Sequence, residues 1–232
     1  MPRRSSLATG EIYHICNRSI DGKTIFRNSR DFMRAVAGLY VFNDTNPPPH
    51  ATSYLRDTPI EEIFQRKRGG EKLVEILAFC IMPNHFHLLV RQLSDDSIPY
   101  FMMKYGTALG KFINIKYKRR GQLFENRYKA ILVDNDAHFI HLPYYIHCNC
   151  LDLSHPKWRT RELKSPQAAI AKMDSYLWSS HLDYSGVTNF PSVIDKEFLF
   201  EFFGGVEKYK KSLVSWLRYM GPASVDGFAL ED

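Results

Sequence analysis

The stretch KLVEILAFCIMPNHFHLLVRQ, residues 72–92, constrains the fold of this chain more than any other segment. Two apolar runs are separated by a Met-Pro-Asn sequence, in which Pro83 cannot donate a hydrogen bond to a neighbouring strand. Proline and asparagine are also typical of tight turns. The pattern therefore predicts two strands that pair antiparallel as a hairpin, with the turn at Pro83 and Asn84.

Two histidines interrupt the second of these strands. Because successive side chains of a strand point to opposite faces, His85, His87 and Leu89 lie on one face while Phe86 lies on the other. Two imidazoles at this spacing can hold one metal ion, since each supplies a nitrogen lone pair. Two ligands alone make a weak site, and histidines at a solvated sheet edge are the alternative interpretation. A third ligand elsewhere in the chain would decide between the two.

The rest of the sequence alternates between strand-like and helix-like segments. Strands are predicted from β-branched and aromatic residues, and helices from apolar residues at helical spacing. The predicted elements are a strand over 10–19, a helix over 29–44, a helix over 96–121, a strand over 122–134 and a helix over 136–150. Ser29 is the expected N-cap of the first helix, and Asp134 or Asn135 that of the last. Together with the hairpin, these elements predict an α+β fold with a central antiparallel sheet and helices packed on it.

Two further segments depart from this pattern. Residues 45–72 contain three consecutive prolines and a basic run, and we interpret them as an insertion or a flexible flap. Near the end of the sequence, residues 195–203 and 205–219 have helical patterns that are separated at Gly204 and Gly205. They predict a helical addition to the central fold.

Composition narrows the class of protein. With 232 residues and 44% hydrophobic residues, the chain can bury one substantial core with extensions. A net charge of +6 and a pI near 9.1 favour a polyanionic partner, although they also fit plain solubility. The four cysteines lack CxxC spacing, and neither a signal-peptide pattern nor an apolar run of about 20 residues occurs. We therefore expect a soluble, cytoplasmic protein.

The last predicted helix supplies a candidate third metal ligand and a candidate nucleophile. Four polar residues, His138, His141, Tyr145 and Asn149, are spaced by three, four and four and so line one helix face. If this face lies across His85 and His87, Asn149 can supply an oxygen ligand beside the two imidazoles. A divalent cation held there polarises a phosphodiester, which leaves the phenol oxygen of Tyr145 to attack phosphorus.

Pro143 complicates this helix. A proline in a helix interior removes one hydrogen bond and clashes with the carbonyl of Phe139, so we expect the helix to kink or to begin afresh at Pro143. That makes the alignment of His138 and His141 with Tyr145 uncertain, and we assign these two histidines to solvated or supporting roles. His147 has no role that the sequence defines.

Several stretches, taken in order, resemble a known family. These are YHICNRSIDGKTIF, MPNHFHLLVR, YKRRGQLFENRYKAILVD, YIHCN and LWSSHLDYSG. Together they are similar to the single-tyrosine HUH transposases, in particular the REP-associated tyrosine transposase branch. The combination of MPNHFHLLV with Tyr-Ile-His-x-Asn about 60 residues later is specific. Cys150 departs from the pattern, since related sequences continue the last motif as Asn-Pro.

The resemblance implies a fold, an activity and a set of site residues. The fold is the ferredoxin-like or RRM-like HUH nuclease fold over residues 1–187, with a helical C-terminal extension over 188–232. His85, His87 and Asn149 match the metal ligands, and Tyr145 matches the nucleophile. The implied cofactor is Mg²⁺ or Mn²⁺. The implied partner is single-stranded DNA near a hairpin, with the protein either a monomer or a homodimer.

Basic residues gather in a few clusters that suit a DNA partner. They interleave with aromatic residues such as Tyr117 and Phe124, and phosphates need cations while unpaired bases need rings to stack on. A solvated surface is the alternative for each cluster alone. The candidate DNA-binding residues are Arg3, Arg4, Lys118, Arg119, Arg120, Arg127 and Lys129.

Other tyrosines are poorer candidates for the nucleophile. Tyr144 points about 100° away from Tyr145 around the helix, which favours packing. Tyr105 lies on the apolar side of its helix, where an aromatic residue is more often core than catalyst.

The leading hypothesis is a metal-dependent strand transferase that cuts and rejoins single-stranded DNA through a 5′-phosphotyrosine link. Two alternatives stay open. One is a catalytically silent protein that binds hairpin nucleic acid. The other is a phosphodiesterase that uses an activated water and forms no covalent adduct.

Overall fold

The computed structural model describes residues 7–160, 162–163 and 165–220. Within these ranges the strands form one antiparallel sheet of order β2-β3-β1-β4. Its strands are β1 (Ile12–Arg18), β2 (Val74–Ile81), β3 (His85–Gln92) and β4 (Lys129–Leu132). Strands β2 and β3 pair antiparallel around the Met82–Asn84 turn, so the predicted hairpin is confirmed. The predicted α+β class is confirmed as well.

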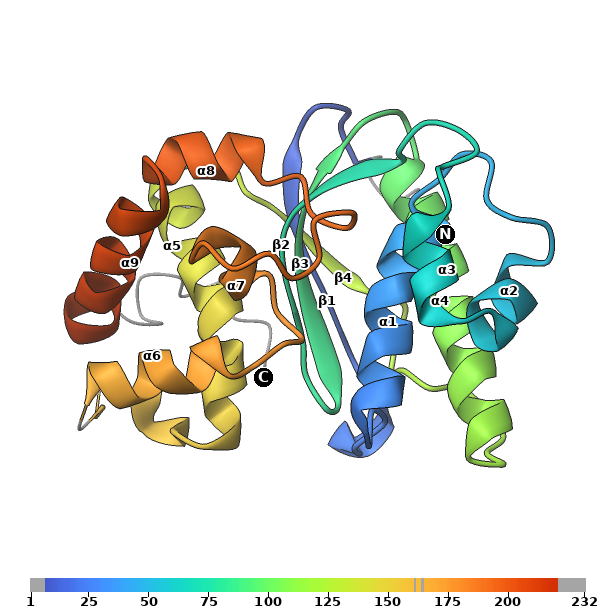
Figure 1. The fold of residues 1–232 in the computed structure, drawn as a ribbon, viewed down its shortest axis with the longest axis horizontal. Coiled ribbons are helices and arrows are strands. Elements are labelled where there is room, and N and C mark those ends of the chain that lie inside the picture. The colour runs from blue at the N-terminus through green and yellow to red at the C-terminus, as the bar shows by residue number, and fades with distance from the viewer. Residues whose placement is uncertain (1–6, 161, 164, 221–232) are drawn as a thin grey trace, which may run out of the picture.

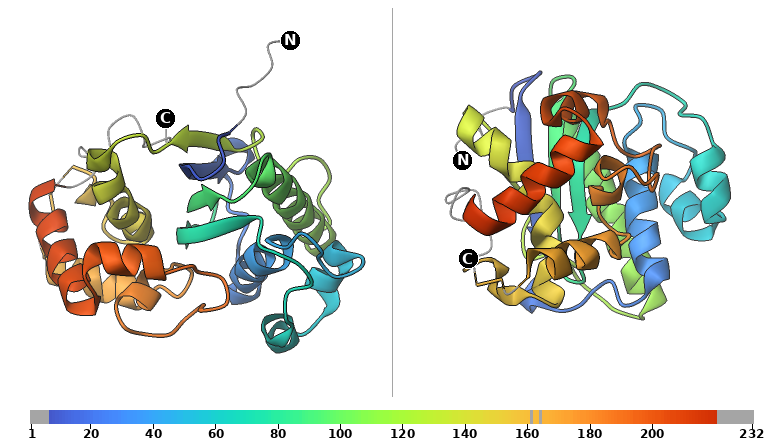
Figure 2. Two further views of the ribbon diagram at one scale, coloured as in Figure 1. Left: turned by 90° about the horizontal axis from the view of Figure 1, so that it is seen from above. Right: turned by 60° about the vertical axis from the view of Figure 1, so that its left-hand side comes forward.

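Helices cover both faces of the sheet. Figure 1 shows α1–α4 on one side of the strands and α5–α9 on the other, and Figure 2 shows the same layers from above. The first group is α1 (Ser29–Phe42), α2 (Ala51–Asp57), α3 (Ile60–Gln65) and α4 (Ser97–Lys116). The second is α5 (Asp136–Cys148), α6 (Pro166–Asp174), α7 (His181–Tyr184), α8 (Glu197–Phe203) and α9 (Val206–Ser215). Short helical turns span Ile20–Gly22, Asn149–Leu153, Pro156–Trp158 and Trp216–Met220.

Side chains of β3 alternate between the two helix layers. Phe86 is fully buried and packs edge-on against Tyr105 of α4, with ring centroids 5.5 Å apart. This is the core position expected for Tyr105. His85 and His87 point to the opposite face, where α5 packs on β2 and β3. The period of two therefore sends the apolar residues to the α1–α4 layer and the histidines to the α5 layer.

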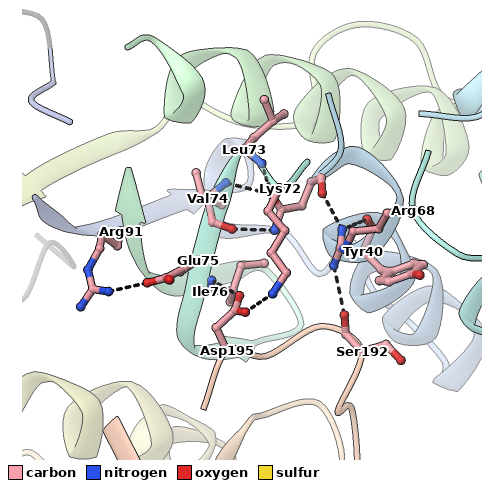
Figure 3. A network of polar contacts seen from close by, with 11 residues as sticks. Tyr40, Arg68, Lys72, Leu73, Val74, Glu75, Ile76, Arg91, Ser192 and Asp195 are labelled. Atoms are coloured by element: carbon pink, nitrogen blue, oxygen red, sulfur yellow. Dashed lines mark hydrogen bonds and ion pairs between the residues drawn. The ribbon is translucent and has the colours of Figure 1, made fainter. Parts of the chain in front are cut away.

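The outer edge of β2 is covered by the segment that follows α6. Cys80 forms a bridge with Ser179, Ile81 N donates to the Trp178 carbonyl, and Asp195 N donates to the Ile76 carbonyl. Figure 3 shows the end of this edge, where Asp195 also accepts from Ile76 N and pairs with Lys72. An unpaired sheet edge invites pairing with another chain. Residues 176–195 remove that hazard here.

Residues 45–72 pack against α1. They contain α2 and α3, whose Leu55 and Ile63 are buried against the first helix group. Arg34 of α1 donates to the carbonyl of Thr58 at the end of α2. The interpretation of the whole segment as an insertion stays a prediction.

Three local expectations differ from the structure. The N-cap of α1 is Asn28, whose side chain accepts from Asp31 N, and not Ser29. The strand expected over 122–134 is limited to β4, because residues 121–128 form a loop that runs along the end of β1. Helix α5 does not begin afresh at Pro143; it is continuous from Asp136 to Cys148 and is capped by Asn135.

Candidate catalytic site

His85 begins β3, directly after the hairpin turn, and its tautomer is set by Asn84. The Asn84 side-chain amide donates to the Gly22 carbonyl at 2.9 Å, which leaves Asn84 Oδ1 to face His85 Nδ1 at 2.7 Å. An amide oxygen can only accept, so His85 Nδ1 carries a proton, and in the neutral ring Nε2 then carries the lone pair. Metal-ligating histidines are oriented in this way by a partner of the other ring nitrogen.

The Asn84 turn is itself held by the loop after β1. Ser19 N donates to the Asn84 carbonyl, and Ile25 N and Phe26 N both donate to the Pro83 carbonyl. These bonds connect the two motifs NRSIDGKTIF and MPN, which are far apart in the sequence. The first motif therefore positions the turn that carries His85.

His87 lies one pleat further along the same face and is almost fully buried. Its ring meets the His85 ring at a centroid distance of 5.1 Å. On its other side, His87 Nδ1 lies 2.9 Å from Nε2 of His14 in β1, and the two rings stack at 5.1 Å. Burial, and to a smaller extent the charge of Arg159, lowers the pKa of His87 to about 3. His87 is therefore neutral at pH 7, as a metal ligand must be.

Helix α5 places Tyr145 against these imidazoles. The Tyr145 ring meets His87 edge-on at 5.8 Å and His14 at 6.4 Å between centroids. Tyr145 is 0% exposed, and Trp158 packs beside it with centroids 5.9 Å apart. The predicted juxtaposition of the helix tyrosine with the strand histidines is thus present, with the phenol in a closed environment.

Asn149, the C-cap of α5, lies one turn after Tyr145. Its side-chain amide donates to the Tyr145 carbonyl at 2.9 Å, which orients the amide oxygen away from the helix backbone. That oxygen, Oδ1, accepts from Arg159 Nη2 at 3.0 Å. Arg159 Nη1 donates at the same time to Tyr145 Oη at 3.0 Å. One guanidinium group therefore joins the hydroxyl of Tyr145 to the amide oxygen of Asn149.

Asp152 and Trp158 hold this guanidinium in place. Asp152 accepts from Arg159 Nε at 2.9 Å and pairs with Arg159 Nη2 at 2.6 Å. The indole of Trp158 donates to the same carboxylate at 2.6 Å, and the guanidinium lies over the Trp158 ring at 4.7 Å. Charge-assisted bonds of this geometry are stronger than neutral ones.

A cavity of about 460 Å³ opens beside the histidines. His85, His87 and Asp152 reach its wall, together with Arg18 and Asn84. In the described ranges, no group of three or more His, Cys, Asp or Glu side chains could hold a metal ion. The donor set that fits a divalent cation here is two neutral imidazoles completed by an oxygen, for which the Asn149 amide is the predicted candidate.

Basic residues flank this end of the sheet. Register pairs Cys16 with both His87 and Lys129, and Arg18 with His85, so the two cations share the face of the histidines. The loop from the end of α4 to β4 follows the end of β1, where Glu125 N donates to the Arg18 carbonyl. Of the candidate DNA-binding residues, Arg119 is half-buried, and the exposed ones are Lys118, Arg120, Arg127 and Lys129. Arg3 and Arg4 lie outside the described residues.

The other histidines of α5 are engaged elsewhere. His138 contacts Asn135, and His141 accepts from the indole of Trp216 at 3.2 Å. His147 is buried between Tyr209 and Ser180, 2.8 Å from each hydroxyl. Tyr144 packs on Phe203, Tyr209 and Trp216, as expected for a packing residue.

Sequence reasoning missed His14, Asp152 and Arg159. His14 had a signal, because it alternates with Cys16 and Arg18 in a predicted strand and therefore shares their face. Arg159 had none. It follows Asn149 by ten residues, and only the two helical turns over Asn149–Leu153 and Pro156–Trp158 return it to Tyr145.

The fold and this site define a class of protein: an antiparallel α+β domain with a His-x-His strand facing a helix that carries Tyr and, four residues later, Asn. Comparison with family models agrees with this class. Residues 55–149, which include all four of these side chains, match the family model described as "Transposase IS200 like". The resemblance predicted from the motifs is therefore confirmed over this segment.

Among solved structures, the fold is similar to one described as "Structure of the REP associates tyrosine transposase bound to a REP hairpin". The identity is 15% and the TM-score 0.47, with 85% of this chain and 94% of that chain covered. A search of curated proteins gave no match. In the part of the chain that the structure describes, no helix has the length and apolar composition of a membrane span.

Proposed function

We propose that this protein is a transposase-type strand transferase that cuts and rejoins single-stranded DNA, with Tyr145 as nucleophile. The observation that carries the proposal is the contact of the buried Tyr145 ring with His87, 5.8 Å between centroids, inside a segment that matches the IS200-like transposases. The matching segment, residues 55–149, includes Tyr145 and His87, and the fold brings the two side chains together. The four free cysteines support a reducing, cytoplasmic setting.

His85, His87 and Asn149 would hold a divalent cation, Mg²⁺ or Mn²⁺. When bound, such a cation polarises the phosphodiester and stabilises charge at phosphorus. The chain contributes the rest of the chemistry. Asn84 and His14 fix the ring orientation of the two histidines, and α5 presents the phenol oxygen.

Strand cleavage transfers a phosphoryl group to the tyrosine. Tyr145 Oη loses its proton to water and bonds to phosphorus, while the bond from phosphorus to the 3′ oxygen breaks and that oxygen takes up a proton. The product is a 5′-phosphotyrosine and a free 3′-hydroxyl. Because one phosphodiester replaces another, a 3′-hydroxyl can reverse the step and rejoin a strand.

The cations near the cavity suit a polyanionic strand. Arg18 reaches the cavity wall, and Lys129 lies on the face of the histidines. The neighbouring loop adds exposed Arg120 and Arg127. We propose that these residues bind the phosphates of single-stranded DNA beside a hairpin.

The burial of Tyr145 favours a second candidate. A phenol that is 0% exposed cannot reach a phosphodiester until the residues that cover it move. A hairpin-binding protein without cleavage would keep Tyr145 in this position permanently. The strand-transfer proposal requires that DNA or metal binding uncovers the Tyr145 hydroxyl.

A denaturing gel separates the candidates. Purified protein is incubated with Mn²⁺ or Mg²⁺ and labelled single strands that carry a hairpin, and a band that survives denaturant reports the covalent adduct. We expect an adduct that is lost in Tyr145→Phe, in His87→Ala and after metal chelation. Tyr144→Phe is the matched control and should keep the adduct.

Three other outcomes would contradict the proposal of strand transfer by Tyr145. Hairpin binding without cleavage under any metal would favour the binding protein. Cleavage without an adduct would indicate an activated water, and an adduct in Tyr145→Phe would place the nucleophile elsewhere.

A further inference from the structure

We infer that Arg159 is a catalytic residue of the strand-transfer reaction, which stabilises the negative charge of the Tyr145 oxygen. The inference rests on the proposed function. Arg159 lies ten residues beyond the segment that matches the family model, so the match does not include it. It is assigned by its contacts alone.

The guanidinium of Arg159 lies beside the atom that would react. Arg159 Nη1 lies 3.0 Å from Tyr145 Oη, the atom that forms and later breaks the bond to phosphorus. A phenol has a pKa near 10, so its oxygen must shed a proton to attack and must leave as an anion when the link is reversed. A guanidinium donor at hydrogen-bond distance from this oxygen favours the charged form in both directions.

The guanidinium of Arg159 is held in a fixed orientation by its neighbours. The Arg159 side chain is only about one-quarter exposed, and its nitrogens are satisfied by Asp152, Asn149 and Tyr145. Asp152 neutralises part of the charge and orients the guanidinium, whose Nη1 reaches the phenol. Preorganised donors of this kind need no rearrangement when charge develops.

Arg159 also contacts Asn149, the predicted third metal ligand. The same guanidinium donates to Asn149 Oδ1 at 3.0 Å, so one side chain contacts both the nucleophile and the predicted third ligand. Asp152 is then a positioning residue, because it orients Arg159.

The test measures adduct formation in single-turnover reactions with the full chain, Mn²⁺ and a labelled hairpin-flanked single strand. We expect Arg159→Gln to form the adduct about 100-fold to 1,000-fold more slowly, the range seen when one preorganised donor to a developing anion is removed. The rate of adduct formation by Arg159→Lys should lie between the rates of the parent and of Arg159→Gln, since lysine keeps the charge but not the forked geometry.

A matched control removes an arginine elsewhere. Arg91 pairs with Glu75 at 2.5 Å near the end of β3 distant from His85, and Arg91→Gln changes the net charge by the same amount. Arg91→Gln should keep the rate of the parent protein. Thermal melts of all variants are recorded in parallel, and added guanidinium ion at a non-denaturing concentration should partly restore Arg159→Ala but not change Arg91→Ala.

The outcomes separate this inference from the proposed function. If the parent protein forms an adduct and folded Arg159→Gln forms it at the same rate, or if guanidinium ion does not restore Arg159→Ala, Arg159 is not catalytic. A faster Arg159→Gln would show that Arg159 restrains Tyr145. If the parent forms no adduct with either metal, the proposed function fails and the inference fails with it.

Discussion

Asn84 combines two roles that are easily missed in a turn residue. Its backbone carbonyl anchors the turn to Ser19, and its side chain connects Gly22 to His85. Because the amide group has a donor end and an acceptor end, fixing the donor on Gly22 determines the proton position on His85. The chemistry of the ligand is therefore decided one residue before it.

Asn84→Ala should weaken Mn²⁺ binding by roughly 10-fold to 100-fold, the usual effect of removing a partner that orients a metal ligand. Without Asn84 Oδ1, His85 can carry its proton on either nitrogen, and only one tautomer binds metal through Nε2. Isothermal titration calorimetry without DNA measures the effect directly. Asn84→Asp, which keeps an acceptor at this position, should retain most of the affinity. Equal affinity of Asn84→Ala and the parent would contradict the tautomer argument.

The candidate site was partly predictable from single residues. Strand alternation places His85 and His87 on one face, and helical spacing places Tyr145 one turn before Asn149. Arg159 could not be predicted in this way, because its contact with Tyr145 depends on how a loop of irregular turns folds back. Such contacts are tertiary, and no local period encodes them.

Helix α5 carries both Tyr145 and Asn149, so its stability controls the geometry of the site. Of the kink and the new start expected at Pro143, the new start is wrong, because local preference is weaker than packing. The residues from Leu142 to Cys148 are all buried, whereas the proline costs about 3 kcal/mol in an exposed helix. Fold class, hairpin and most helices followed from periodicity, while the ends of the elements depended on caps such as Asn28 that compete with neighbouring candidates.

Asn135→Ala should lower the free energy of unfolding by about 1 kcal/mol, the typical value for loss of an N-cap side chain. Asn135 Oδ1 accepts from His138 N at 2.9 Å, which satisfies one of the unpaired donors of the first turn of α5. Urea denaturation followed by circular dichroism gives the difference. Asn135→Asp keeps the acceptor and should unfold like the parent. An equal loss in both variants would mean that the cap bond does not stabilise α5.

At the scale of the whole molecule, a buried polar network connects the helices of the α5 layer to the sheet. Ser180 joins Phe79 of β2 to His147 of α5, and Tyr209 of α9 joins His147 to His181 of α7. Every bond of this network can be satisfied with both histidines neutral. Burial, followed by the charge of His181, lowers the pKa of His147 well below its ordinary value. Burial in this network therefore favours the uncharged form of His147.

The stability of the protein should fall in mild acid. Below a pH of about 6.5 the unfolded chain binds a proton at His147 that the folded chain does not bind, so the free energy of unfolding decreases as pH falls. Between pH 6.5 and pH 5 this group alone contributes a loss of up to about 2 kcal/mol. Urea unfolding of the parent and of His147→Gln, which can keep both hydrogen bonds without titrating, isolates the effect. Parallel curves for the two proteins over this range would show that His147 is not the group responsible.

The central claim is that Tyr145 bonds covalently to DNA, and mass spectrometry of the trapped adduct tests it most directly. Trypsin cleavage after Lys129 and Lys157 releases residues 130–157, a peptide that contains both Tyr144 and Tyr145. Fragment ions assign the nucleotide to one of the two. We predict a 5′-linked nucleotide on Tyr145 and an unmodified Tyr144. A nucleotide on Tyr144 or on another peptide, or the absence of any modified peptide after DNA cleavage, would contradict the claim.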